Sequence, residues 1–471
     1  MLNLIKNEYV KILKKKSTII WLAILLVLSL GLLYLSSREL TVDIIYSDTE
    51  YMSKEFVDDQ LKSYVTAEEK TYADYYVLLK VKELGMYDRD DWVYTQLTSA
   101  ADLLSPGTSE ANKKIFDAVA ISLQSGNPND YLAAMAAHYG SNTYTFPGSE
   151  NAITNPYQYC LDENINPITD TKLFEYASTL LFIQDNLEHL YVSDGEHSSS
   201  YESAYNSFLV INKLLKEKQS HALIDASVTN TAQSSMNLIG NSNAIATVTS
   251  PAEESKFWNI LQLSSSLVTM IEILMLIIAG SCVATEFSSG TIKFLLINPV
   301  SRSKIIISKY AMVVSFSFIC VAVYFVICTV FALLLGGTSD IGGCYITASN
   351  GSVTMYSGFI YIAKLYLYAF IDIICYGTLA FALSSLFRNS AISIGISIAL
   401  SISGNIITSI LANINQDWGR YLLFSNTDLA TIQEGNSLFP NQTVTFAAIV
   451  IVLHLIVFLW TAYDGFTRRE V

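Results

Sequence analysis

Three ionisable side chains lie inside long apolar stretches of the sequence: Glu272, Asp372 and His454. If these stretches are helical, the rise of about 1.5 Å per residue places both acids roughly 20 Å from the next charged residue towards the C-terminus. A charged group at such a depth in a membrane is unfavourable by about 2.5–3.5 kcal/mol, so it normally faces protein or water. We therefore predict that Glu272, Asp372 and His454 line a transport pathway. The alternative is that each is neutralised by a proton or by a hydrogen bond to a neighbouring helix.

A second group of charged side chains lies in the short stretch from Ala284 to Tyr310, between two apolar runs. It combines a single acid, Glu286, with four bases, which are Lys293, Arg302, Lys304 and Lys309. Arginine and lysine at such a place can meet carboxylates or lipid headgroups. Gly290 permits a tight turn, and Pro299 ends a helix. We predict a helix over residues 286–298, stopped by Pro299, with the next apolar helix beginning at Arg302; taken singly, each residue also suits any short loop.

Other familiar chemistry has no pattern in this sequence. There is no GxxxxGK[ST] loop to hold nucleotide phosphates, no HExxH and no G-x-S-x-G. The six cysteines form neither a CxxC pair nor a cluster with histidine, which argues against a structural zinc site. We expect a protein that is not an enzyme and binds no cofactor or metal. The sequence does not decide whether Cys160 and Cys344 form a disulfide.

The elements that would position these groups are membrane-spanning helices. The chain of 471 residues is 51% hydrophobic and only 15% charged, well below the charge of soluble domains. Six apolar runs each reach the roughly 20 residues needed to cross a bilayer. They are Thr18–Leu35, Ile260–Val283, Ile305–Leu335, Phe359–Phe387, Ala391–Leu411 and Thr445–Tyr463. The fifth alternates like a strand, but a lone strand cannot satisfy its backbone in lipid, so we predict a helix.

The distribution of basic residues predicts how the spans are oriented in the membrane. Basic residues concentrate at alternate span ends: the lysines of the amphipathic segment 1–16, those of the loop 284–304, Arg388, Arg468 and Arg469. Under the positive-inside rule both termini and this loop are cytoplasmic. The first span is residues 17–37, and the outer segment 413–443, rich in aromatic residues, is either a re-entrant pair of short helices or a loop.

Between the first two spans lies a polar insertion, residues 38–257. It holds 32 of the 42 acids but only 14 of the 28 Lys and Arg residues, which argues against nucleic-acid binding. We predict an acidic, mainly α-helical extracellular domain. Its expected helices cover residues 51–84, 91–104, 110–123, 128–139, 171–190 and 201–218, with strands possible near 244–249. The predicted fold class is an all-α membrane protein with five further spans in residues 258–471.

The loop after the second span also carries an ordered set of residue types: an acid, a Gly-Thr, an apolar turn, Pro-x-Ser-Arg and a lysine entering the next span. These are Glu286, Gly290, Thr291, Leu295, Pro299, Ser301, Arg302 and Lys309. The loop resembles that of the ABC-2 family of ATP-binding-cassette transporter permeases. LFRNSAISIGIS, containing Arg388, is similar to the second cytoplasmic turn of that family. The resemblance covers residues 1–40 and 257–471.

This resemblance implies a plasma-membrane permease subunit that exports an amphiphilic, peptide-like or antimicrobial compound. Its expected partners are cytoplasmic ABC ATPase subunits, a second permease chain, identical or different, and the lipid bilayer. The implied ATPase-coupling residues are Glu286, Gly290, Thr291, Lys293, Leu295, Pro299 and Arg302. The alternative is a non-transporting membrane receptor or scaffold whose extracellular domain binds a ligand or partner.

Overall fold

A computed structural model describes most of the chain. It covers residues 2–37, 54–66, 73–85, 110–140, 144–193, 199–220, 222–224, 256–291, 301–338, 341–349, 352–414, 416–433, 437–439 and 442–468, with the single positions 87, 92, 96, 97, 100 and 104. The fold is mostly helical, as the sequence predicts.

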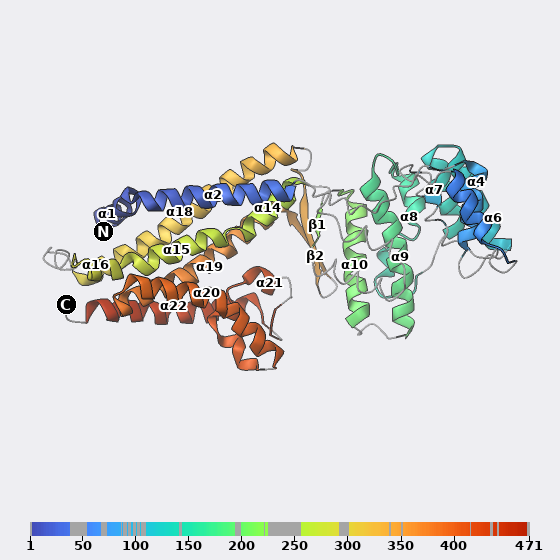
Figure 1. Ribbon diagram of the computed structural model, residues 1–471. Helices are drawn as coiled ribbons and strands as arrows, with labels where there is room; N and C mark the ends of the chain where they lie inside the picture. The colour runs from blue at the N-terminus through green and yellow to red at the C-terminus, as the bar shows by residue number, and fades with distance from the viewer. Residues whose placement is uncertain are drawn as a thin grey trace.

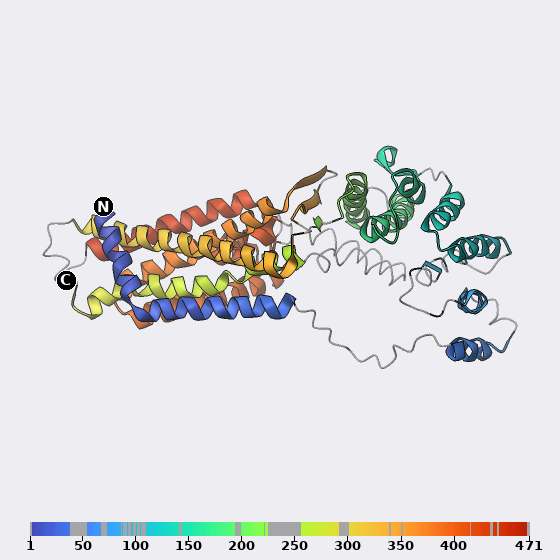
Figure 2. The same ribbon diagram turned by 90° about the horizontal axis from the view of Figure 1, so that it is seen from above.

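Among the described residues, six helical segments are long and apolar enough to cross a membrane, and each overlaps one of the predicted runs. They are α2 (Lys16–Ser37), α14 and α15 together (Lys256–Ser266 and Thr269–Cys282), α18 (Arg302–Gly336), α19 (Gly358–Phe387), α20 (Ser390–Asn413) and α22 (Val444–Thr467). The amphipathic helix α1 (Leu2–Lys14) precedes them. Both chain ends lie at one end of this bundle, and the polar insertion lies beyond the other end (Figures 1 and 2).

The polar insertion, called the inserted domain below, folds around its own apolar core. Its helices are α3 (Lys54–Ser63), α4 (Ala73–Leu84), α6 (Glu110–Gln124), α7 (Pro128–Tyr139), α8 (Pro156–Asp162), α9 (Thr171–Ser193) and α10 (Ser199–Lys216), with a 3-10 turn η3 (Ser149–Asn151). Local sequence sets these boundaries: Asn127 caps the start of α7 and Pro128 takes its first position. Gly126 and Gly140, with positive φ, end α6 and α7.

The single helical region predicted over residues 51–84 is instead two helices, because residues 64–66 between α3 and α4 are not helical. Most of the helix predicted over 91–104 and the strands suggested near 244–249 lie outside the described residues.

A small sheet, which the sequence analysis does not predict, joins the inserted domain to the bundle of a mostly helical fold. Strands β2 (Cys344–Ser349) and β3 (Ser352–Ser357) form an antiparallel hairpin between α18 and α19. The short strand β1 (Ala222–Ile224), which follows α10, pairs parallel to β2, with Leu223 opposite Tyr345. The sheet therefore lies between α10 and the membrane helices (Figure 1). Cys160 and Cys344 belong to the same core, but both are free thiols, so they form no disulfide.

Aromatic rings fill the base of this sheet. Trp258 and Phe257, at the start of α14, are fully buried. Gly343 and Gly358 leave no room for a side chain against the indole of Trp258, and Tyr345 stacks on Tyr361 with 3.9 Å between ring centroids. The hairpin is thereby packed against the ends of the membrane helices α14 and α19.

The segment after α20 folds back onto the bundle. It consists of two 3-10 turns, η4 (Asp417–Tyr421) and η5 (Leu423–Ser425), and the short helix α21 (Leu429–Gln433). Its buried residues Leu423, Leu429 and Ile432 share a core with Cys375 of α19 and with Ala447 and Ile451 of α22. We call residues 417–433 the covering segment.

Candidate functional site

The loop after α15 begins with a short helix that contacts α19. Helix α15 ends at Cys282, and the short helix α16 (Ala284–Ser288) follows after Val283. The backbone N–H groups of Val283 and Ala284 both donate to Ser384 Oγ of α19, at 3.2 and 2.9 Å. Because Val283 and Ala284 are buried, this hydroxyl satisfies backbone groups at the junction and joins it to α19.

The predicted helix over 286–298 is confirmed at residues 286–288 but does not continue through Gly290, and residues 292–298 lie outside the described residues. The helix ends at Ser288, and Gly290 follows with a φ of +70°, a conformation that ends a helix and favours glycine. The turn lets the Thr291 hydroxyl donate back to the Glu286 carboxylate. Three of the predicted coupling residues, Lys293, Leu295 and Pro299, lie outside the described residues.

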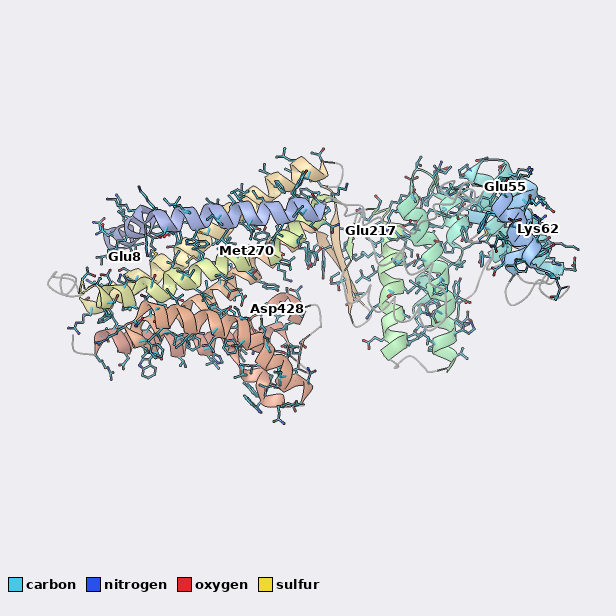
Figure 3. All side chains as sticks on the ribbon, in the orientation of Figure 1. Glu8, Glu55, Lys62, Glu217, Met270 and Asp428 are labelled. Atoms are coloured by element: carbon cyan, nitrogen blue, oxygen red, sulfur yellow. The ribbon has the colours of Figure 1, made fainter. Side chains whose placement is uncertain are left out.

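Glu286 belongs to a buried ionic cluster at the end of the bundle where the chain termini lie. We define this ionic cluster as Glu8 and Lys11 of α1, Glu286 of α16 and Lys309 of α18. The Lys309 ammonium lies 2.8 Å from Glu8 Oε2 and 3.2 Å from Glu286 Oε1. Lys11 contacts the same two carboxylates, at 3.1 and 2.7 Å. Figure 3 marks Glu8 on α1, at this end of the molecule.

Most side chains of this ionic cluster are buried, and their contacts stabilise the charged form of Glu286. The side chain of Lys309 is only 1% exposed and those of Glu8 and Glu286 are 12% and 13% exposed, whereas Lys11 is half exposed. Burial alone would raise the pKa of Glu286, but the charge of Lys309 and the hydrogen bonds from Lys11 and Thr291 outweigh it and lower that pKa to about 2. The Lys309 ammonium also donates to the carbonyl of Cys282, at 3.3 Å. Helices α1, α15, α16 and α18 are thus joined at one point.

A second set of contacts holds the other side of α16. The Phe287 ring lies 4.5 Å from the Arg388 guanidinium, which follows the end of α19, and 6.3 Å from the ring of Phe466 in α22. Arg302, at the start of α18, donates to the carbonyl of Thr467 at 3.3 Å. Among the predicted coupling residues, Glu286, Gly290 and Thr291 therefore lie together, while Arg302 contacts the end of α22.

Sequence reasoning missed Glu8, Ser384 and Phe287, and it used Lys11 only as one of the basic residues that predict the orientation in the membrane. One signal was available: Glu8 is the only acid in residues 1–16, among five lysines. An isolated acid on a basic amphipathic helix reduces its attraction to anionic lipid and so indicates a protein partner.

The predicted pathway acids lie on neighbouring helices, α15 and α19, within the bundle. Glu272 is 6% exposed and accepts a hydrogen bond from Ser401 Oγ of α20 at 2.8 Å. Asp372 is close enough for the charge of Glu272 to act on it, and Thr427 of the covering segment lies beside it. The hydrogen bond of His454 lies within its own helix: Nδ1 is 2.9 Å from the carbonyl oxygen of Val450.

An apolar groove of about 390 Å³ lies elsewhere on the bundle, between α2, α15 and α18. Its lining includes Leu26, Ile271 and Phe316, and none of the predicted pathway residues reaches it. Among the residues that the structure describes, no three His, Cys, Asp or Glu side chains gather where they could hold a metal ion.

The fold is that of a membrane protein with several helices long and apolar enough to cross a bilayer. The chain belongs to the family described as protein of unknown function DUF2705, which matches residues 230–471. It is 32% identical to the uncharacterized protein YhcI of Bacillus subtilis (strain 168) over 216 residues, 45% of this chain and 69% of that protein. It is 31% identical to the uncharacterized membrane protein YdbK of the same strain over 227 residues, 48% of this chain and 87% of that protein. No solved structure matches the chain.

Proposed function

We propose that this chain is the membrane-spanning subunit of an ABC-2-type transporter, driven by ATP that a separate cytoplasmic subunit hydrolyses. The observation that carries the proposal is the ionic cluster. It ties α16, the first part of the proposed coupling loop, to the amphipathic helix α1 and to the start of α18. A force applied to α16 would therefore reach two other helices through short, buried contacts.

The remaining contacts of α16 extend this coupling. Phe287 contacts Arg388 and Phe466, and the backbone just before α16 donates to Ser384 of α19. An ATPase that binds under the loop would thus act on α19 and α22 as well. Proteins transmit such displacements through packed elements that have two alternative arrangements.

In the proposed arrangement, both termini and the loop 284–304 are cytoplasmic and the inserted domain is extracellular. The basic residues at one end of the bundle and the acidic composition of the inserted domain support this orientation. Two permease chains, identical or different, would face each other, and the cargo would be an amphiphilic, peptide-like or antimicrobial compound that is exported.

The test is co-purification with the product of a neighbouring ATPase gene, followed by ATPase measurements on the reconstituted complex. We expect a complex whose ATP hydrolysis changes when Arg302→Ala or Gly290→Ala is introduced. Lys364→Ala, at the other end of α19, is the matched control and should leave ATPase activity unchanged. A chain that purifies without an ATPase, or a complex indifferent to both loop variants, would contradict the proposal.

That negative result would favour the receptor or scaffold instead. The observation that supports a receptor or scaffold is the inserted domain, which has an extensive apolar core. A domain of this kind can recognise a partner without transport.

A further inference from the structure

The space around Asp372 has unusual chemistry for the interior of a membrane bundle. Asp372 lies midway along α19, and Tyr376 lies one helical turn further on the same face. Glu272 reaches the same region from α15, close enough for its charge to act on both residues. Two acids and a phenol therefore lie within electrostatic range of one another, in a region where charges are normally excluded.

No base compensates these acids. Within the described part of the chain, neither Glu272 nor Asp372 forms an ion pair with a lysine, arginine or histidine within 4.0 Å. The charges that act on Asp372 belong to two other acids, Glu272 and Asp428. Asp428, marked in Figure 3, is an exposed residue of the covering segment. The acids therefore form a series that leads from the interior of the bundle to its surface.

The region also holds buried oxygen atoms whose hydrogen-bonding capacity is not used. Oδ1 of Asp372 and the hydroxyl of Tyr376 are both buried and make no hydrogen bond among the described residues. Tyr376 as a whole is only 2% exposed. Buried polar atoms without a partner are rare in native proteins and suggest a missing ligand.

The covering segment closes this region along one face of α19. Tyr368, Asp372 and Tyr376 lie on successive turns and each contacts the segment. Tyr368 donates to Gln433, Thr427 lies beside both Asp372 and Tyr376, and Phe424 stacks on Tyr376 with 6.1 Å between ring centroids. Displacement of Thr427 would make Asp372 accessible to another donor.

We propose that Glu272, Asp372 and Tyr376 form a binding site for a primary ammonium group carried by an amphiphilic ligand. An ammonium group offers three N–H donors and no acceptor, which matches a site of acids and a phenol without a base. A proton alone would neutralise one acid but would not satisfy the remaining buried oxygens. That this ligand is the transported compound rests on the proposed function; the binding itself does not.

The test is ligand binding to the full chain, purified in detergent without any ATPase. Dodecylammonium is the probe, and dodecanol, with the same chain and no charge, is its control. The measurement is the concentration dependence of the shift in thermal unfolding midpoint. We expect dodecylammonium to stabilise the wild-type chain in a saturable manner, whereas dodecanol does not.

The variants Asp372→Asn and Glu272→Gln should each weaken dodecylammonium binding at least tenfold. Tyr376→Phe keeps the ring packed on Phe424 and should weaken it about threefold, which covers the case in which an acid variant fails to fold. Ser317→Ala is the matched control, because it removes a buried polar group of α18 that bonds within its own helix, outside this site. Equal affinity in all variants, or equal stabilisation by dodecanol, would refute the ammonium site. Protonation alone would then neutralise these acids.

This result is independent of the ATPase test. Loss of probe binding in the wild-type chain would refute the ammonium site while an ATPase complex still formed. Failure to form that complex would refute the transporter and leave the binding measurement unaffected.

Discussion

Replacing Lys309 by methionine should destabilise the protein strongly. Methionine keeps the apolar stem of lysine but removes the ammonium that contacts Glu8, Glu286 and the carbonyl of Cys282. Two largely buried carboxylates would then share only Lys11, whose side chain is 51% exposed. Removing one partner of a buried ion pair leaves an uncompensated charge.

The size of the effect follows from two lines of reasoning. Breaking a buried ion pair generally lowers the free energy of unfolding by about 3–5 kcal/mol. The pKa of Glu286, about 2 against an ordinary 4.5, gives a similar figure of about 3 kcal/mol for the whole environment of this carboxylate. Because Lys11 remains in contact with both acids, we expect a loss of about 2–4 kcal/mol for Lys309→Met.

The assay is equilibrium unfolding of the purified chain in mixed micelles, with Lys304→Met as the matched control. Lys304 lies on the same helix but is exposed, so its replacement should change the free energy by less than about 0.5 kcal/mol. Glu286→Gln combined with Lys309→Met should lose less than the two single changes added together, since the residues interact directly. Additive losses, or equal effects of the two lysine variants, would refute the reasoning.

Two further results are expected. Because the folded-state pKa of Glu286 lies below its unfolded value, the carboxylate contributes stability above about pH 4.5 that is lost as the pH falls towards about 2; unfolding at several pH values should show this dependence in wild type and a weaker one in Glu286→Gln. Gly404 of α20 faces the Phe424 ring, and an added Cβ would overlap it, so Gly404→Ala should lower the free energy of unfolding by about 1–3 kcal/mol. Gly395→Ala, on the same helix with nothing within 4 Å, is the control and should be neutral or stabilising; equal effects of the two changes would contradict this packing.

The membrane helices could be predicted because length and hydropathy alone decide them. The helix ends in the inserted domain followed from local signals, such as Asn127 with Pro128 at the start of α7 and Gly140 at its end. The β2–β3 hairpin is not predicted by the sequence analysis, although Asn350-Gly351 separates two β-prone segments. A short loop between two spans can connect them without any strand, so the signal is easily overlooked. Its pairing with β1 joins Leu223 to Tyr345, far apart in the chain, and no local pattern encodes such a contact.

The ionic cluster shows the same limit more clearly. The loop residues Glu286 and Lys309 were recognised from their types and order, but Glu8 lies 301 positions before Lys309. A charge pattern indicates that a group needs a partner, and only the packing of α1 against α18 shows which partner it has. The depth of Glu272 and Asp372 was predictable from helix length, whereas the covering segment over Asp372 was not.

The sheet between the inserted domain and the bundle also sets an order for biosynthesis. Cys344, Ile346 and Ala348 of the hairpin are part of the same apolar core as the inserted domain. These residues are translated only after α14, α15 and α18. The core of the inserted domain therefore stays incomplete until these three helices have been synthesised. The last step in folding of this core occurs only when the helices are correctly placed. A chain truncated before Cys344 should be a substrate for quality-control proteases.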